Sequence, residues 1–284
     1  MTIINDHWLD QFIENSLRED VGDGDHTSLA IIPENKIGKA QLIVKETGII
    51  AGIEVAENIF RKFDPKIKFH VFIKDGAHVS PGDIVFITEC NVLTILKCER
   101  VVLNIMQRMS GIATQTSKYV NILNGLKTKV LDTRKTTPGM RILDKWAVVL
   151  GGGINHRIGL YDMILIKDNH IDFAGGIENA IRSVKNYLAE KKLDLNIEVE
   201  ARNLSDVKEI LNIGGIQRIM LDNFDLETTR KAVDIINGKY ETESSGGITL
   251  DTIRDYACCG VDFVSVGAIT HNIKSLDLSL KAVE

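Results

Sequence analysis

The sequence has 284 residues, of which 44% are hydrophobic, and a formal net charge of −5. This length and composition suit one large α/β domain with a smaller one, and they exclude a disordered chain. The acidic balance, with only 6% aromatic residues, argues against nucleic acid as the main partner. The first ten residues lack a signal-peptide pattern and no apolar run reaches membrane-spanning length, so we expect a cytoplasmic protein that does not interact with membranes.

The first 110 residues or so predict an α+β domain. Strands are expected over 39–45, 67–73 and 84–87, and the Gly-containing turns at 75–76 and 81–83 are typical of hairpins. The stretch from Val92 to Met109 contains neither Gly nor Pro and predicts a long helix. We expect Gly111 to end that helix.

From about residue 113 a strand-then-helix pattern repeats. The predicted strands cover 129–131, 163–166, 196–199, 218–221, 239–241 and 262–266. Such a repeat predicts a parallel barrel or a doubly wound sheet. Polar or glycine residues follow every strand, and the carboxyl ends of barrel strands converge on one face. The sequence therefore predicts a shared active site there.

A basic block follows the first of these strands. Between Arg134 and Arg157 the sequence contains five basic residues and one acid, a local charge of +4, and the basic residues are Arg134, Lys135, Arg141, Lys145 and Arg157. Cations beside Gly-rich turns suit a ligand with several carboxylates or phosphates. A solvated helix face is the alternative, but it would normally intersperse both signs.

The last two units contain the glycine-rich segments 244–248 and 265–269. Loops after the final strands of a barrel commonly present backbone N–H groups to a phosphate, so the two segments together favour a phosphate monoester as ligand. Either segment alone is also compatible with a simple tight turn.

Glu200 and Asp222 end neighbouring predicted strands. Carboxylates in this position suit Mg²⁺, which takes one or two protein carboxylates and completes its shell with phosphate and water. The alternative is a structural salt bridge to Lys167 or Arg134. His156 is either a proton donor or a neutral hydrogen-bonding partner.

The motifs in this order resemble those of one enzyme family. They are Glu99-Arg100, 103–104, 110–114, Asp132-Thr-Arg-Lys-Thr136, Gly151-Gly-Gly-Ile-Asn-His-Arg157, 165–170, 198–200, 221–224 and 245–248. The family is nicotinate-nucleotide diphosphorylase (carboxylating), also called quinolinate phosphoribosyltransferase. The match extends over nearly the whole chain.

The resemblance implies an α/β fold with two domains. It implies an N-terminal α/β sandwich over 1–112 and an incomplete, six- or seven-stranded α/β barrel over 113–272. For 273–284 we expect a C-terminal helix that packs back on the N-terminal domain. The resemblance further implies a homodimer, or a higher oligomer built from it, in which the first domain of one subunit caps the partner's barrel.

The resemblance also implies roles for individual residues. Quinolinate would contact Arg134, Lys135, His156, Arg157 and Lys167, with Arg100 supplied by the partner subunit. Glu200 and Asp222 would serve the ribose and the Mg²⁺-pyrophosphate region of phosphoribosyl pyrophosphate, and Lys135, Glu200 and Asp222 are the expected catalytic residues. Further substrate contacts are expected at Thr133, Ser245, Gly246, Gly247, Gly267 and Ala268.

Arg100 is not singled out by composition, because a surface pair with Glu99 is the default for a charged helix residue. Two other functions remain open from the sequence. A barrel transferase of the same fold, associated with molybdenum transport, would act on another acceptor, and a non-catalytic phosphate-ligand sensor would have lost Lys135, Glu200 or Asp222. The presence of all three residues and of Arg100 favours the quinolinate reaction.

Overall fold

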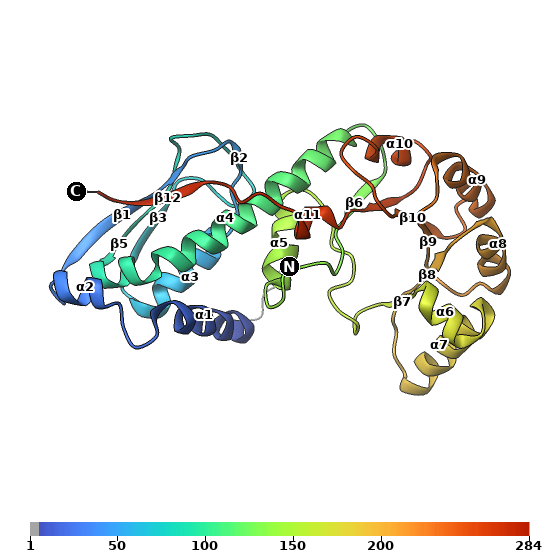
Figure 1. The fold of residues 1–284 in the computed structure, drawn as a ribbon, viewed down its shortest axis with the longest axis horizontal. Helices are drawn as coiled ribbons and strands as arrows, with labels where there is room; N and C mark the ends of the chain where they lie inside the picture. Colours follow the sequence, from blue (N-terminus) through green and yellow to red (C-terminus); the bar gives the residue numbers. More distant parts are fainter. Residues whose placement is uncertain (1–5, 284) are drawn as a thin grey trace. The chain divides into compact units, whose positions relative to one another are not determined.

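The computed structural model describes residues 6–283 and divides the chain into two compact units (Figure 1). Residues 1–5 and 284, which contain the start of the expected first domain and the end of the expected C-terminal helix, lie outside the described residues. The first unit is built from residues within 1–117, 136–152 and 269–284, and the second from 118–135 and 153–268.

The first unit has a four-stranded antiparallel sheet in the order β12-β1-β5-β3. Its strands are β1 (Ile37–Val44), β3 (Lys68–Val71), β5 (Ile84–Asn91) and β12 (Leu278–Val283), with a small pair formed by β2 (Gly48–Ile49) and β4 (His78–Val79). Its helices are α1 (Asp6–Val21), α2 (His26–Ile31), α3 (Ile53–Phe63), most of α4 (Val92–Ile122), α5 (Arg141–Leu150) and most of α11 (Ala268–His271).

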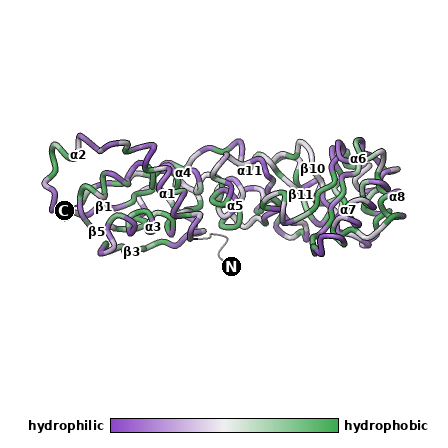
Figure 2. Tube along the Cα trace, turned by 90° about the horizontal axis from the view of Figure 1, so that it is seen from below, coloured by the Kyte–Doolittle hydropathy of each residue, from purple (hydrophilic) through white to green (hydrophobic). Residues whose placement is uncertain are grey.

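Helix α3 and the sheet share one hydrophobic core. The buried side of α3 includes Ile59 and Phe60, both fully buried. The Phe60 ring lies 6.2 Å from that of Phe69 on β3, which lies 4.4 Å from that of Phe86 on β5. Hydrophobic stretches recur along both units of the chain (Figure 2). The aromatic contacts therefore fix α3 against two neighbouring strands.

Helix α4 does not end where the sequence predicted. It continues through Gly111 to Ile122, so the prediction that Gly111 breaks it is wrong. The glycine serves a close approach instead: a Cβ at this position would lie 2.4 Å from the carbonyl oxygen of Lys274. Among the described residues no helix, α4 included, is long and apolar enough to cross a bilayer.

The C-terminal segment forms a strand, and the prediction of a helix over 273–284 is wrong. Strand β12 pairs antiparallel with β1, with Leu278 opposite Val44 and Leu280 opposite Leu42. Leu278 and Leu280 are buried while Lys281 is exposed, an alternation that matches a strand on the edge of a half-buried sheet. The segment thus joins the N-terminal sheet rather than packing on it as a helix.

The second unit is a six-stranded parallel sheet in the order β6-β11-β10-β9-β8-β7. Its strands are β6 (Lys129–Leu131), β7 (Ile164–Ile166), β8 (Ile197–Ala201), β9 (Arg218–Asp222), β10 (Glu241–Ser245) and β11 (Phe263–Ser265). Strands β6 and β7 are the two edges, so the barrel is incomplete as predicted. The segment after Gly153 lies beside β6, where Ile154 bridges Leu131 in parallel.

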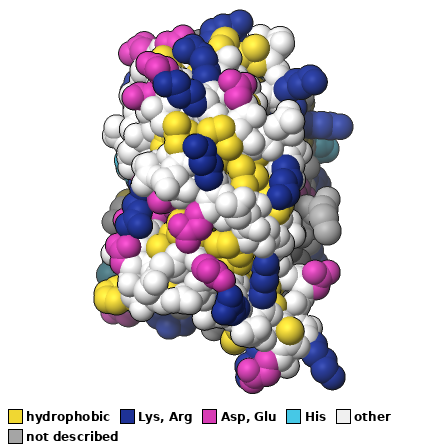
Figure 3. Space-filling view, turned by 90° about the vertical axis from the view of Figure 1, so that its right-hand side faces the viewer, with side chains coloured by type: hydrophobic (Ala, Val, Ile, Leu, Met, Phe, Trp, Pro, Cys, Tyr) yellow, Lys and Arg dark blue, Asp and Glu magenta, His cyan; other side chains and the backbone are white. Residues whose placement is uncertain are grey.

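Helices alternate with these strands along the chain. They are α6 (Asp168–Ala174), α7 (Ile177–Lys191), α8 (Leu204–Ile213), α9 (Leu226–Ile236) and α10 (Ile253–Ala257). On the face shown in Figure 3, Lys and Arg side chains lie among Asp and Glu. Arg182 pairs with Glu178 on α7, and Lys231 pairs with Glu227 on α9 at 2.6 Å. The outer helices therefore carry the mixed charge of a solvated surface.

The close approach at Gly111 predicts that replacing this glycine by alanine lowers the stability of the protein. In an uncrowded helix interior, Gly→Ala stabilises a protein by about 0.5–1 kcal/mol. Gly111→Ala should instead lower the melting temperature, because the added Cβ would collide with the backbone of Lys274. Thermal unfolding followed by circular dichroism measures this, with Gln115→Ala on the same helix as a control. A melting temperature at or above that of the wild type would contradict the assigned role of Gly111.

Candidate functional site

The parallel sheet brings most of the predicted site residues of the second unit to one edge. Thr133, Arg134 and Lys135 follow β6, Lys167 follows β7, and Glu200 lies one residue before the end of β8. Asp222 and Ser245 are the last residues of β9 and β10, and Gly267 and Ala268 come shortly after β11. Because all six strands are parallel, these positions share the carboxyl edge of the sheet.

The basic block of the sequence is divided between the two units. Arg141 and Lys145 belong to α5 in the first unit, and Lys145 is fully buried. The acid of the block, Asp144, is also fully buried and forms a bidentate pair with Arg108 of α4, at 2.8 and 2.7 Å. These residues hold α5 against α4. Of the five cations, only Arg134, Lys135 and Arg157 belong to the second unit.

Arg134 and Arg157 both belong to the second unit, and the charge of Arg134 acts on Arg157. Arg157 is only 8% exposed, and its pKa is lowered first by burial and then by the charge of Arg134. Its Nη1 donates a long hydrogen bond of 3.3 Å to the Met163 carbonyl oxygen. The Nε of Arg134 is buried and has no hydrogen-bond partner in the part of the chain that the structure describes. Like charges held together in this way favour an anionic ligand.

Glu200 takes the structural alternative considered from the sequence. One of its carboxylate oxygens lies 3.3 Å from Lys167 Nζ, and the other accepts the Asp168 backbone N–H at 3.0 Å. Glu200 is buried, whereas the Lys167 side chain is half exposed. Asp222 is half-buried, and its carboxylate accepts a hydrogen bond from the Asn223 amide at 2.8 Å.

The backbone conformation of the loop after β10 explains why the loop contains two glycines. Gly246 has a φ of 103°, and a Cβ there would lie 2.2 Å from the Asn223 side-chain oxygen. Asn223, itself at φ 57°, donates its backbone N–H to the Ser245 carbonyl at 2.8 Å. Gly247 has a φ of 60° but borders open space. Gly246 thus lets two loops approach closely, while Gly247 leaves its backbone accessible.

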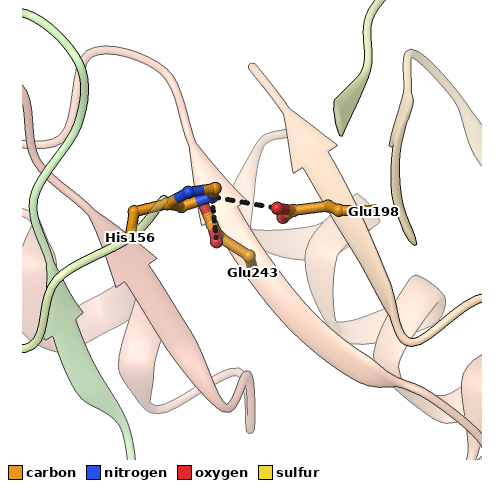
Figure 4. A group of neighbouring side chains, drawn as sticks. All are labelled: His156, Glu198 and Glu243. Atoms are coloured by element: carbon orange, nitrogen blue, oxygen red, sulfur yellow. Dashed lines mark ion pairs between the residues drawn. The ribbon is translucent and has the colours of Figure 1, made fainter. Parts of the chain in front are cut away.

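Sequence reasoning missed two acids inside the sheet. The carboxylates of Glu198 on β8 and Glu243 on β10 are fully buried and point toward His156 (Figure 4). His156 Nε2 lies 2.9 Å from Glu198 and 3.4 Å from Glu243. Arg218 on β9 contacts Glu243 at 3.1 Å and Glu241 at 3.0 Å. The available signal was Glu198, an acid within the strand predicted over 196–199, because parallel strands are usually buried on both faces. Glu243 lies beyond the strand predicted over 239–241 and gave no such signal.

This buried group contains an unusual balance of charge. Burial, followed by the charge of Glu243, raises the pKa of Glu198 to about 7. Burial alone would lower the pKa of His156, but the two carboxylates raise it to about 9. However, His156 Nδ1 accepts the Arg157 backbone N–H at 2.7 Å, which places the ring proton on Nε2. The Nε2 edge of the ring therefore faces the two carboxylates.

Arg100 belongs to the first unit, on α4. It is exposed and makes no ion pair within the described residues, so the surface pair with Glu99 is not seen.

Two family models match the chain. The model "Quinolinate phosphoribosyl transferase, C-terminal domain" matches residues 112–281, and "Quinolinate phosphoribosyl transferase, N-terminal domain" matches 25–110.

Individual proteins show the same similarity. The chloroplastic nicotinate-nucleotide pyrophosphorylase [carboxylating] of Oryza sativa is 46% identical over 96% of this chain and 77% of its own length. The probable enzyme of that name from Synechocystis is 40% identical over 99% and 93%. The solved structure of the nicotinate-nucleotide pyrophosphorylase from Francisella tularensis has a TM-score of 0.92 and 39% identity, covering 99% of this chain and 98% of its own.

Proposed function

Because the chain belongs to the quinolinate phosphoribosyltransferase family, we propose that it makes nicotinate mononucleotide from quinolinate and phosphoribosyl pyrophosphate. The phosphoribosyl group goes to the ring nitrogen of quinolinate, and CO₂ and pyrophosphate are released. The chain is then a pentosyltransferase of de novo NAD biosynthesis. The observation that carries the proposal is the pair of arginines in the second unit, since quinolinate has two adjacent carboxylates: Arg157 is buried, and the buried Nε of Arg134 has no hydrogen-bond partner among the described residues.

The remaining cations suit the same substrate. Lys135 follows Arg134 directly and is exposed at the edge of the sheet, where it neutralises the 2-carboxylate region. Lys167, half exposed and close to Glu200, supplies a further positive charge. Together these groups offset the charge of two carboxylates, a phosphate and a diphosphate in one place. Thr133, on the same loop, completes the substrate contacts.

The glycine-containing loops hold the 5-phosphate of the co-substrate. Gly247 supports this role because its backbone borders open space, while Gly246 fixes the loop against Asn223. Ser245 precedes the two glycines, and Gly267 with Ala268 follows the neighbouring strand. Backbone N–H groups at such strand ends bind phosphate oxygens well.

Glu200 and Asp222 serve the ribose and the diphosphate end. Their carboxylates fit Mg²⁺ held largely by pyrophosphate oxygens, because Glu200 already pairs with Lys167 and the Asp168 N–H. The ion would neutralise the leaving diphosphate. Glu200 and Asp222 themselves stabilise the positive charge that develops on the sugar as pyrophosphate departs.

The pyridine nitrogen of quinolinate then attacks the anomeric carbon and becomes cationic. This charge stabilises the carbanion left when the adjacent carboxylate leaves as CO₂, and the carbanion then takes a proton from water, so the protein needs no decarboxylation cofactor. The residues of the site orient the two substrates and neutralise their charge.

We place the enzyme in a homodimer with shared active sites, or in a higher oligomer built from that dimer. Arg100 supports this arrangement, because it is exposed on α4 and matches the family's motif for an arginine supplied in trans. A cytoplasmic location remains a prediction, since plant relatives are named chloroplastic or mitochondrial.

The direct test mixes purified protein with quinolinate, phosphoribosyl pyrophosphate and Mg²⁺ and measures nicotinate mononucleotide and CO₂. Product should form in the presence of Mg²⁺, disappear with EDTA and return when Mg²⁺ is added in excess, because a divalent ion neutralises the leaving group. Absence of product with Mg²⁺ would overturn the proposed function. Full activity in EDTA would show that lysine and arginine suffice without metal.

The shared site predicts complementation between two inactive variants. Lys135→Ala should lower turnover by about 10²-fold or more, because it removes a cation aimed at reacting charge. Arg100→Ala should weaken quinolinate binding much more than phosphoribosyl pyrophosphate binding. Mixed subunits then place both lesions in one pocket and leave the other intact, restoring about a quarter of wild-type activity in an equal mixture.

A mixture of Lys135→Ala with Arg157→Ala is the matched control and should stay inactive, because both residues lie in the same unit of one subunit. If heterodimers of the Arg100 and Lys135 variants form but remain inactive, Arg100 does not act in the partner's site.

A further inference from the structure

Three buried side chains and one partly buried arginine form a network next to the site. His156 comes from the segment beside β6, and Glu198 and Glu243 come from β8 and β10 (Figure 4). The fourth residue, Arg218, comes from β9. Both glutamate side chains are fully buried, and the His156 side chain is 6% exposed. Buried carboxylates are costly unless they are paired, so their placement around one imidazole needs an explanation.

The imidazole connects these acids to the backbone of Arg157. Its Nε2 faces Glu198 at 2.9 Å and Glu243 at 3.4 Å, while its Nδ1 accepts the backbone N–H of Arg157 at 2.7 Å. The backbone N–H of His156 is in turn held by Asp132 at 2.8 Å. Both edges of the ring are therefore turned toward protein groups, and neither ring nitrogen is directed by these contacts at a substrate.

A metal ion is the competing explanation for the group. Among the described residues, His156, Glu198 and Glu243 are the one set of such side chains whose ligand atoms lie within 4.8 Å of one another. An imidazole binds a metal through one nitrogen while the other carries its proton and donates it. Here Nδ1 is an acceptor, so Nε2 carries the proton and has no lone pair for a metal. Arg218 already supplies a cation to Glu243 at 3.1 Å.

We propose that Glu198 and Glu243 are positioning residues that hold the His156 ring, which in turn fixes the backbone of Arg157 and thereby its guanidinium. The inference rests on the proposed function in taking quinolinate as the ligand of Arg157. Among the described residues, the guanidinium makes one hydrogen bond, a long one of 3.3 Å to Met163, so its direction depends strongly on where the backbone holds it. His156 thus acts through Arg157 rather than as a proton donor to the substrate.

The two acids differ in how well they tolerate change. Glu243 is balanced by Arg218, whereas Glu198 has no arginine or lysine contact among the described residues. Glutamine at position 198 keeps an oxygen next to Nε2 and removes a buried negative charge. Methionine has a similar length but no acceptor, so it preserves the packing and breaks the link to His156.

The experiment compares Glu198→Met with Glu198→Gln and measures KM separately for quinolinate and for phosphoribosyl pyrophosphate. Glu198→Met should raise the KM for quinolinate by about tenfold or more and leave that for phosphoribosyl pyrophosphate within about twofold. Glu198→Gln should restore the quinolinate KM to within about threefold of the wild type. The matched control is Glu241→Gln, an exposed residue that also contacts Arg218 but does not contact His156, and both of its KM values should be unchanged.

If Glu198→Met does not fold, His156→Phe removes the same link from its other end and should show the same selective loss. A folded Glu198→Met or His156→Phe with unchanged KM values, or with equal losses for both substrates, would overturn the proposal. So would a metal ion bound by His156, Glu198 and Glu243 in a crystal structure of the wild-type protein.

A crystal structure of Glu198→Met provides a readout that does not depend on turnover. It should show the Nδ1 contact to the Arg157 N–H broken and the guanidinium displaced, and an unchanged contact would overturn the proposal. If the wild type makes no product, the proposed function fails, but this structure still decides whether Glu198 positions Arg157.

Discussion

Positive charge at the carboxyl edge of the parallel sheet is the constraint on which the second unit depends. The chain as a whole is acidic, yet Arg134 and Arg157 lie near enough for the charge of one to lower the pKa of the other. Like charges repel, so this arrangement requires a scaffold that fixes each group before a ligand arrives. On the outer helices, by contrast, basic residues pair with acids one turn away and impose no such requirement.

Strand β8 shows how the scaffold meets this requirement. Glu198 and Glu200 are two residues apart and therefore lie on the same face of the strand. Glu198 contacts His156 beneath the edge of the sheet, and Glu200 contacts Lys167 at the edge itself. One strand thus presents one acid to His156 and a second acid to Lys167. The two acids lie two residues apart, which is the period at which side chains return to the same face of a strand.

The sequence predicted the architecture where side-chain patterning is strong. Strands such as β6 and β9 were found because short apolar runs precede polar residues, and the predicted ranges match closely. The strand predicted over 239–241 shares only Glu241 with β10, because the buried centre of β10, Thr242 to Ser244, is polar. The prediction that Gly111 ends α4 was wrong because glycine ends many helices. The close approach of Lys274, which the sequence does not reveal, explains why a glycine is needed inside this helix. Glu198 and Glu243 escaped because their partner, His156, is distant in sequence.

The central claim is that paired cations of the second unit recognise both carboxylates of quinolinate. Titration calorimetry with quinolinate and with nicotinate, which lacks the 2-carboxylate, tests it most directly. Losing one charge-assisted pair costs about 1.5–3 kcal/mol, so nicotinate should bind about 10- to 100-fold more weakly. Equal dissociation constants for the two acids would contradict the account.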